Sequence, residues 1–155
     1  MMYFAYVSNM DWEQMRYRCP SARYVCRAEL KQHRLIFPRW SDKQGGGVSS
    51  VESDEDATVW GVVYQINSSD EITLDRKEGF RGVGDKRNSY DLELEQVYRD
   101  GDSDNPLQVD VYIARKTSSH IPPSRKYRCL IVGGAQYWRL PDDYIACLRR
   151  IEAKG

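Results

Sequence analysis

Glu78 has the sequence context best suited to acid–base chemistry in this chain. It stands four residues after Leu74, so in a helix the two side chains lie on one face. A carboxyl group on the face of a core leucine is partly desolvated, and desolvation raises its pKa toward neutrality. Such a group can accept and return a proton near pH 7. The alternative is a solvated glutamate at a charged helix end, because Asp75 and Lys77 are close neighbours.

A second candidate site follows the first apolar segment, at Ser8-Asn9-Met10. Where a strand turns into the start of a helix, several backbone N–H groups have no partner, and they can hold a carboxylate or a developing oxyanion. The alternative is that Ser8 and Asn9 only cap the helix that follows.

Hydrophobic periodicity indicates the elements that would position these residues. In the first part of the chain it predicts a strand over residues 2–7, a helix over 11–18 capped by Asn9 or Asp11, one or two strands over 22–37, a flexible loop over 42–47, a solvated acidic turn over 52–56 and a strand over 57–66. The strand over 57–66 is apolar on both faces, as in a barrel wall that helices cover.

The second part combines a hairpin with three helices. Ser68-Ser69-Asp70-Glu71 matches a capping box and predicts a helix that runs to about Glu78 and ends at Gly79. The alternating segments 90–99 and 107–115 predict a β-hairpin, and helices are expected over 124–137 and from Pro141 to Ile151. Strands in the middle and helices at the end favour an α+β fold in one domain, residues 1–155, over a Rossmann-like sheet.

The composition excludes several classes of partner. Lys+Arg and Asp+Glu number 23 each, so the basic excess typical of nucleic-acid binding is missing. No apolar run approaches the ~20 residues of a membrane span, and the N-terminus does not have the pattern of a signal peptide, which favours a cytoplasmic protein. Four scattered cysteines and two histidines do not form a metal-binding pattern.

Five motifs in order resemble the γ-glutamylcyclotransferase family, which has an AIG2-like fold. They are Tyr-Phe-Ala-Tyr-x-Ser-Asn, Val-Trp-Gly-Val-Val-Tyr, Leu-Asp-x-x-Glu-Gly, Pro-Pro-Ser-x-x-Tyr and Gly-Ala…Leu-Pro-x-x-Tyr. The resemblance extends from Tyr3 to about Glu152 and is greatest to the branch that acts on γ-glutamyl amino acids.

This resemblance implies a mixed, mostly antiparallel β-barrel flanked by helices. It also implies conversion of a γ-glutamyl amino acid to 5-oxoproline and a free amino acid, without metal or cofactor. The many aromatic residues of the chain, if exposed, would in addition allow a homodimer. Glu78 matches the acid/base residue, and an arginine that the sequence does not identify is expected to assist by charge. The matching substrate-binding positions are Tyr6, Val7, Ser8, Asn9, Met10, Tyr90, Tyr112 and Tyr127. The match of Tyr90 crosses a loop, 81–89, that looks longer than usual in the family.

Val7 departs from the family pattern, which has glycine at this position. Glycine permits a positive φ and a close approach of the backbone to a ligand, and valine resists both. Two alternatives therefore accompany the main interpretation. One is a binding domain of the same fold that has lost its activity. The other is a cyclotransferase for γ-glutamylamines or another γ-glutamyl conjugate.

Overall fold

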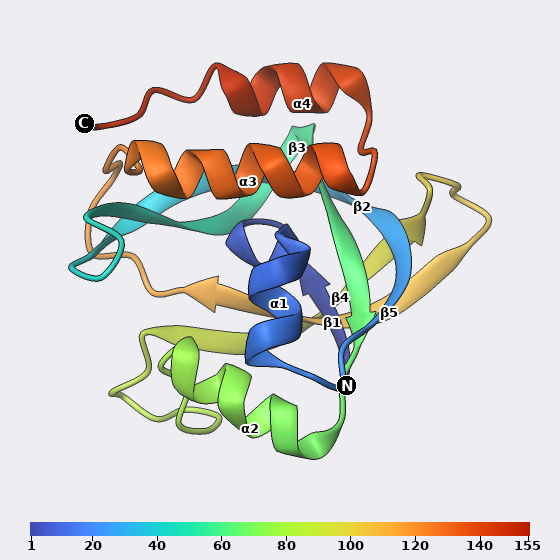
Figure 1. The fold of residues 1–155 in the computed structure, drawn as a ribbon, viewed down its shortest axis with the longest axis horizontal. Coiled ribbons are helices and arrows are strands. Elements are labelled where there is room, and N and C mark those ends of the chain that lie inside the picture. Colours follow the sequence, from blue (N-terminus) through green and yellow to red (C-terminus); the bar gives the residue numbers. More distant parts are fainter.

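The computed structural model describes all residues from Met1 to Gly155, and a closed five-stranded barrel forms its centre (Figure 1). The strands are β1 (Met2–Ala5), β2 (Arg23–Ser41), β3 (Gly46–Gln65), β4 (Tyr90–Arg99) and β5 (Pro106–Ala114), in the barrel order β1-β3-β2-β4-β5. β1 runs parallel to β5, with Tyr3 beside Asp110, and the other paired strands are antiparallel. The predicted mixed, mostly antiparallel barrel is therefore confirmed.

The barrel wall has apolar side chains on both faces. Val59 and Val63 of β3 point into the barrel, where they pack with residues contributed by all five strands. Val62 and Tyr64 of the same strand point outward and pack against the helices. All four side chains are fully buried, so the two-faced strand predicted over 57–66 is confirmed as the end of β3.

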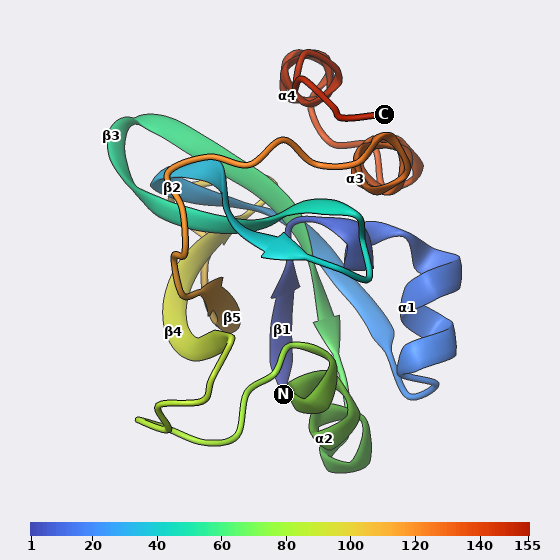
Figure 2. The ribbon, with the colours of Figure 1, turned by 90° about the vertical axis from the view of Figure 1, so that its left-hand side faces the viewer.

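Four α-helices and one 3-10 helix cover the barrel. They are η1 (Ser8–Met10), α1 (Trp12–Arg18), α2 (Ser68–Lys77), α3 (Arg125–Tyr137) and α4 (Asp142–Arg149). Figures 1 and 2 show α4 lying beside α3 on the side away from the barrel, with α1 and α2 below them. None of these helices combines the length and the apolar character needed to cross a membrane.

The helix starts are fixed by side-chain caps. Asp11 accepts a hydrogen bond from the Gln14 N–H at 2.9 Å, so Asp11 is the cap of α1 and Asn9 is not. The capping box predicted at 68–71 is wrong by one residue, because Asn67 is the cap of α2 and accepts from the Asp70 N–H at 2.9 Å. An asparagine in the extended conformation before the first helical residue satisfies that N–H as well as serine would.

The acidic turn predicted over 52–56 is wrong, because these residues continue β3. β2 and β3 form one long antiparallel pair with three register shifts, in which Arg34 lies opposite Glu52. Arg34 Nη2 and Lys116 Nζ approach the Glu52 carboxylate at 2.8 and 2.7 Å. Ion pairs with basic side chains therefore keep the acidic segment 52–56 in the extended conformation. The low strand propensity of acidic residues alone predicts a turn here.

The β2–β3 hairpin also turns more tightly than the sequence indicates. Its turn covers residues 42–45, whereas Gly46 and Gly47 already belong to β3 and are buried. The segment 22–37 is part of a single strand, β2, which continues to Ser41. The tip of this hairpin lies near the end of α2, where it forms one side of a cavity (Figure 1).

Candidate active site

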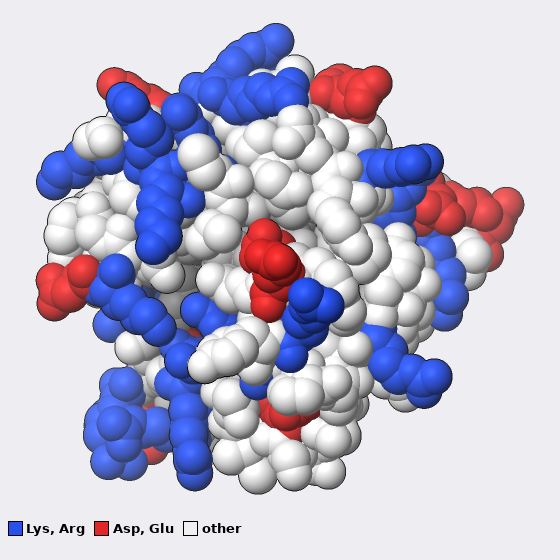
Figure 3. All heavy atoms as spheres, in the orientation of Figure 1, with Lys and Arg blue, Asp and Glu red and all other residues white.

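A cavity of about 340 Å³ opens between the tip of the β2–β3 hairpin, the turn after β1 and the end of α2. Figure 3 shows a hollow on this side of the molecule, at the left of the view, with Lys and Arg side chains around it. Most of the positions predicted from sequence line this cavity, namely Tyr6, Val7, Ser8, Asn9, Glu78, Tyr90, Tyr112 and Tyr127.

Glu78 is held at the cavity by the way in which α2 ends. It is the C-cap residue, and Gly79 behind it has a φ of +64°, which favours glycine. The N–H of Gly79 donates to the Arg76 carbonyl at 3.2 Å, and the N–H of Phe80 donates to the Asp75 carbonyl at 2.8 Å. These two bonds form a Schellman motif, so the backbone of Glu78 is fixed.

The Glu78 carboxyl group lies in a desolvated and weakly paired environment. No hydrogen bond or ion pair joins its oxygens to another protein group, and Leu74, one turn earlier in α2, is fully buried. Burial raises the pKa of Glu78 to about 7, although the positive charge of Arg18 opposes the shift. The residue is half-buried and keeps contact with the cavity, so its proton can be exchanged there.

Five tyrosines surround Glu78. Burial raises the pKa of each of them, and the charge of Glu78 raises these pKa values further. The five side chains are Tyr3, Tyr6, Tyr90, Tyr112 and Tyr127, all of which line the cavity. A carboxylate within electrostatic reach of so many phenols occupies the middle of the site.

Two of these tyrosines tie the cavity to the barrel and to α2. The Tyr6 hydroxyl donates to the backbone carbonyl of Tyr112 at 2.8 Å. The Tyr112 hydroxyl in turn donates to Asp75 Oδ1 at 2.6 Å, which fixes α2 against β5. Since the protein engages both phenolic protons, these side chains shape the wall, and neither has its proton free for a substrate carboxylate.

Ser49 links two further predicted tyrosines. Its carbonyl accepts a 2.8 Å hydrogen bond from the Tyr90 hydroxyl, and its Oγ lies 2.9 Å from the Tyr127 hydroxyl. Ser49 is fully buried and thereby joins β3, β4 and α3 under the cavity. Sequence reasoning missed it, because a serine near a glycine-rich loop has no distinguishing pattern.

The turn after β1 lines the cavity with Val7, Ser8 and Asn9 and contains backbone donors without a backbone acceptor. The N–H groups of Met10 and Asp11 return to the carbonyls of Val7 and Ser8, both at 3.0 Å. The N–H groups of Val7, Ser8 and Asn9 make no such turn bond, as expected at the first residues of a helical turn. Val7 has a φ of −137°, so valine adopts this conformation without the penalty of a left-handed backbone.

Asn9 anchors this turn. Its Nδ2 donates to the Tyr3 hydroxyl at 3.0 Å, and its Oδ1 accepts from Arg18 Nη1 at 2.9 Å and from Gln14 Nε2 at 3.2 Å. The backbone carbonyl of Asn9 also accepts from Tyr64 at 2.9 Å. Because its side chain is occupied by protein partners, Asn9 acts mainly by holding the backbone donors in place.

Met10 is the predicted residue that the structure does not bring to the cavity. Its side chain is completely buried in the cluster between barrel and helices. Its carbonyl accepts hydrogen bonds from Trp138 Nε1 at 2.8 Å and from the Tyr64 hydroxyl at 3.4 Å. Both its backbone groups and its side chain are therefore used in packing, and we do not assign it a role in substrate contact.

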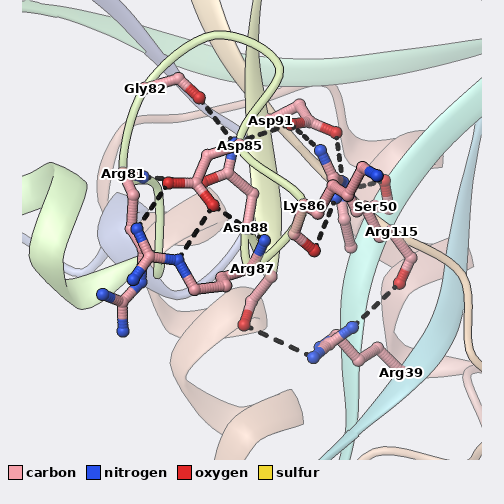
Figure 4. Close-up of polar contacts among 12 residues, drawn as sticks. Arg39, Ser50, Arg81, Gly82, Asp85, Lys86, Arg87, Asn88, Asp91 and Arg115 are labelled. Atoms are coloured by element: carbon pink, nitrogen blue, oxygen red, sulfur yellow. Dashed lines mark hydrogen bonds and ion pairs between the residues drawn. The ribbon is translucent and has the colours of Figure 1, made fainter.

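The loop between Glu78 and Tyr90 is held by a polar network (Figure 4). Asn88, only 3% exposed, accepts from the Arg81 N–H at 2.7 Å and donates to the Gly82 carbonyl at 2.8 Å and to Asp91 at 3.0 Å. Arg115 adds two hydrogen bonds to Asp91, at 2.8 and 2.9 Å. The loop is therefore well anchored, and the strand that follows places Tyr90 at the cavity.

Arginines at the cavity supply the charge that the sequence leaves unassigned. Arg39 of β2 donates to Ser89 Oγ and to the Arg115 carbonyl, both at 3.3 Å, and faces no carboxylate (Figure 4). Arg18 reaches the cavity from the end of α1. Neither guanidinium has a protein carboxylate within 4.0 Å, so both are available to an anionic ligand.

The site combines one desolvated carboxylate with unbonded backbone N–H groups and with arginines that have no carboxylate partner. In a closed mixed barrel, this combination is typical of a small enzyme that uses acid–base catalysis. Residues 58–148 match the model of the AIG2-like family. The gamma-glutamylcyclotransferase of Mus musculus is 32% identical over 97% of this chain and 78% of its own, and that of Homo sapiens is 31% identical with the same coverage.

Solved structures agree with these sequence relatives. A gamma-glutamyl cyclotransferase superposes with a TM-score of 0.87 at 29% identity, covering 99% of this chain and 89% of that chain. An uncharacterized protein from Homo sapiens gives a TM-score of 0.86 at 30% identity, with 99% and 88% coverage. The chain therefore belongs to the AIG2-like family and, within it, to the γ-glutamylcyclotransferases.

Proposed function

We propose that this protein converts γ-glutamyl amino acids to 5-oxoproline and a free amino acid, with Glu78 as the acid/base residue. The observation that carries the proposal is the Glu78 carboxyl group, which lines the cavity as its only acidic side chain, without a hydrogen-bond or ion-pair partner in the protein. Burial raises the pKa of this group to about 7. Such a group accepts and donates protons at neutral pH.

The reaction is an intramolecular acyl transfer. The α-nitrogen and the γ-carbonyl carbon of the glutamyl group are separated by four bonds, so attack closes a five-membered lactam. The new C–N bond forms as the amide bond to the leaving amino acid breaks. Because both reacting groups belong to the substrate, the reaction needs no cofactor, and a site that holds the glutamyl chain curled gains part of the ~7–11 kcal/mol available from orientation.

Glu78 moves the protons in this scheme. The ionised carboxylate takes a proton from the α-ammonium group, which makes the nitrogen nucleophilic. It then returns this proton to the departing nitrogen. The attacking nitrogen loses a second proton as the lactam N–H forms, and the same carboxylate passes that proton to the released amine, so no net proton is consumed at this residue. The backbone N–H groups of Val7, Ser8 and Asn9 stabilise the tetrahedral oxyanion in this proposal, which is supported by their lack of a backbone acceptor and by the place of these residues in the cavity lining.

The glutamyl α-carboxylate requires a cationic partner. Arg39 suits this role, because its guanidinium lines the cavity and uses only two hydrogen bonds, both 3.3 Å long, within the protein. The tyrosine walls then exclude water from the curled glutamyl chain. The proposal thus uses the tyrosines as packing surfaces and Arg39 as the anionic anchor.

The test is an assay of purified protein with γ-glutamyl-alanine. We expect stoichiometric release of 5-oxoproline and alanine. The Glu78→Gln variant should lose roughly 10²–10⁴ of the rate while it keeps the wild-type circular dichroism spectrum. Full activity of that variant would remove Glu78 from the mechanism. Binding of γ-glutamyl-alanine without turnover by the wild type would instead favour the non-catalytic alternative.

The cellular setting is part of the same proposal. A place in 5-oxoproline and glutathione metabolism and a cytoplasmic location follow from the proposed substrate. Exposed aromatic side chains support a homodimer: Tyr24 stacks on Trp138 with ring centroids 4.2 Å apart, and Tyr137 beside them is 60% exposed. Sedimentation equilibrium measures this directly, and a monomer mass at micromolar concentration would contradict the dimer.

A further inference from the structure

Three positive side chains from three separate elements meet at the mouth of the cavity. Lys43 lies in the turn between β2 and β3, Lys77 is the last residue of α2, and Arg18 is the last residue of α1. All three line the cavity that contains Glu78, and positive side chains border the hollow in Figure 3. Glu78 is the only acidic side chain among the lining residues.

These cations have no counter-ion in the protein. Lys116, Arg87 and Arg115 elsewhere on the surface each contact a carboxylate at 2.7–2.8 Å. In contrast, neither lysine at the mouth has an acidic partner within 4.0 Å. All three side chains line one cavity, and the charges of Lys77 and Arg18 accordingly lower the pKa of Lys43.

Helix termination explains only part of this arrangement. Basic residues often occupy the last turn of a helix, where they offset its dipole, and Arg18 and Lys77 fit that pattern. Lys43 does not, because it belongs to a hairpin turn. Both lysines are exposed, so solvent screens the repulsion between these cations, and an anion bound among them would relieve what remains.

We propose that Lys43 and Lys77 bind the carboxylate of the leaving amino acid, an inference that rests on the proposed function. The glutamyl amine must reach the buried Glu78, so the amide nitrogen and the leaving group extend toward the mouth. In an α-amino acid only one carbon separates the departing nitrogen from the carboxylate. Lys77 adjoins Glu78 in the chain, and Lys43 lines the same cavity from the β2–β3 turn, so both border the path along which this carboxylate extends.

The subsite determines which γ-glutamyl compounds are good substrates. A γ-glutamyl amino acid brings one negative charge to two unpaired ammonium groups, and that interaction is both attractive and able to steer the substrate. A γ-glutamylamine or a C-terminal amide leaves the two lysines unneutralised. The enzyme therefore discriminates against substrates whose leaving group has no carboxylate.

The experiment compares γ-glutamyl-alanine with γ-glutamyl-alaninamide in wild type, Lys43→Met, Lys77→Met and the double variant. We expect wild type to prefer the acid in kcat/KM by roughly tenfold or more. The double variant should reduce this ratio to within about threefold of unity, chiefly through a loss of kcat/KM on the acid. Added salt should lower the wild-type preference. Lys126→Met, an exposed lysine outside the cavity, is the matched control and should keep the wild-type ratio.

Two results would overturn the subsite. One is equal kcat/KM of wild type on the two substrates, and the other is an undiminished preference in the double variant. Absence of 5-oxoproline from either substrate is a different result, which contradicts the proposed function itself. In that case calorimetric titration of the two compounds still decides the subsite, because tighter binding of the acid must depend on Lys43 and Lys77.

Discussion

Arg18 Nη1 donates a 2.9 Å hydrogen bond to Asn9 Oδ1, which joins the end of α1 to the turn after β1. The same guanidinium is the charge that lowers the pKa of Glu78 against the larger effect of burial. One arginine therefore both holds the backbone donors and adjusts the acid/base residue. The two roles can be separated, because only the second changes a pH profile.

Replacing Arg18 by methionine should move the pH dependence of catalysis upward. Glu78 acts as a base when ionised, so kcat/KM of wild type should rise with pH through about 7. Without the positive charge the ionised form is less favoured, and the midpoint of the rise moves to higher pH. The measurement is kcat/KM for γ-glutamyl-alanine between pH 5 and about 9.

Arg16→Met is the control for this prediction, because Arg16 is exposed on the same helix and does not line the cavity. Its pH profile should coincide with that of wild type. If Arg18→Met reduces the rate but leaves the midpoint unchanged, Arg18 acts only through Asn9.

Glu78→Gln should stabilise the folded chain at neutral and alkaline pH. Folding raises the pKa of Glu78 from 4.5 to about 7, so the ionised form is disfavoured in the folded state. Relative to the neutral variant, wild type has equal stability below pH 4.5, loses stability as the pH rises from 4.5 to about 7, and keeps this deficit at higher pH. The variant should therefore exceed wild type by roughly 2–3 kcal/mol at pH 8, as measured by urea unfolding.

Below pH 4.5 the stability difference should be close to zero. Glu93→Gln removes an exposed glutamate without an ion pair and should show no comparable gain at pH 8. A constant difference between Glu78→Gln and wild type across the whole pH range would mean that burial does not perturb this carboxyl group.

Local patterns predicted the strands and Glu78, whereas the closed barrel was implied by the resemblance to a family. The alternating strands 90–99 and 107–115 pair as expected, with Tyr90 opposite Ala114. Glu78 is identifiable because a leucine one turn earlier and a glycine directly after it define both its face and the helix end. The resemblance to a family located the tyrosines, which periodicity alone does not distinguish from core residues.

The errors come from interactions between distant segments. Residues 52–56 read as a turn until Arg34 and Lys116, from two other parts of the chain, neutralise Glu52. Met10 lies next to binding residues in sequence, but the approach of α3 places it in the core. Ser49, Lys43 and Arg39 were missed because the tertiary fold alone brings them to the cavity.

Val7→Gly tests whether the family glycine has functional value here. The φ of Val7 is −137°, so this position does not use the positive φ that favours glycine. The variant should keep or raise kcat/KM, but lose roughly 1–3 kcal/mol of unfolding free energy, because Val7 packs against both hydrophobic clusters. Thermal unfolding and the γ-glutamyl-alanine assay measure the two effects.

Val83→Gly, at a side chain that is 96% exposed, is the control and should change stability by less than about 0.5 kcal/mol. If Val7→Gly keeps the fold but loses more than about tenfold in kcat/KM, the turn depends on valine. A change of that size exceeds the usual effect of a neutral substitution.

Gly134→Ala should damage the active site from a distance. A Cβ atom at Gly134 would lie 2.6 Å from the backbone carbon of Met10 and 2.8 Å from the Asp11 nitrogen, so α3 could no longer approach η1 as closely. Either α3 or the turn must move, at a cost of roughly 1–3 kcal/mol in unfolding free energy. A displaced turn carries the N–H groups of Ser8 and Asn9 with it, so kcat should fall more than the affinity for substrate.

The adjacent glycine provides a matched control. A Cβ atom at Gly133 meets nothing within 4 Å, and the residue lies in the middle of α3. Gly133→Ala should therefore stabilise the protein by roughly 0.5–1 kcal/mol through helix propensity and leave kcat unchanged. We therefore expect Gly133→Ala to raise the unfolding free energy and Gly134→Ala to lower it. Only Gly134→Ala should also lose kcat. Equal effects would mean that contact between α3 and η1 does not position the oxyanion donors.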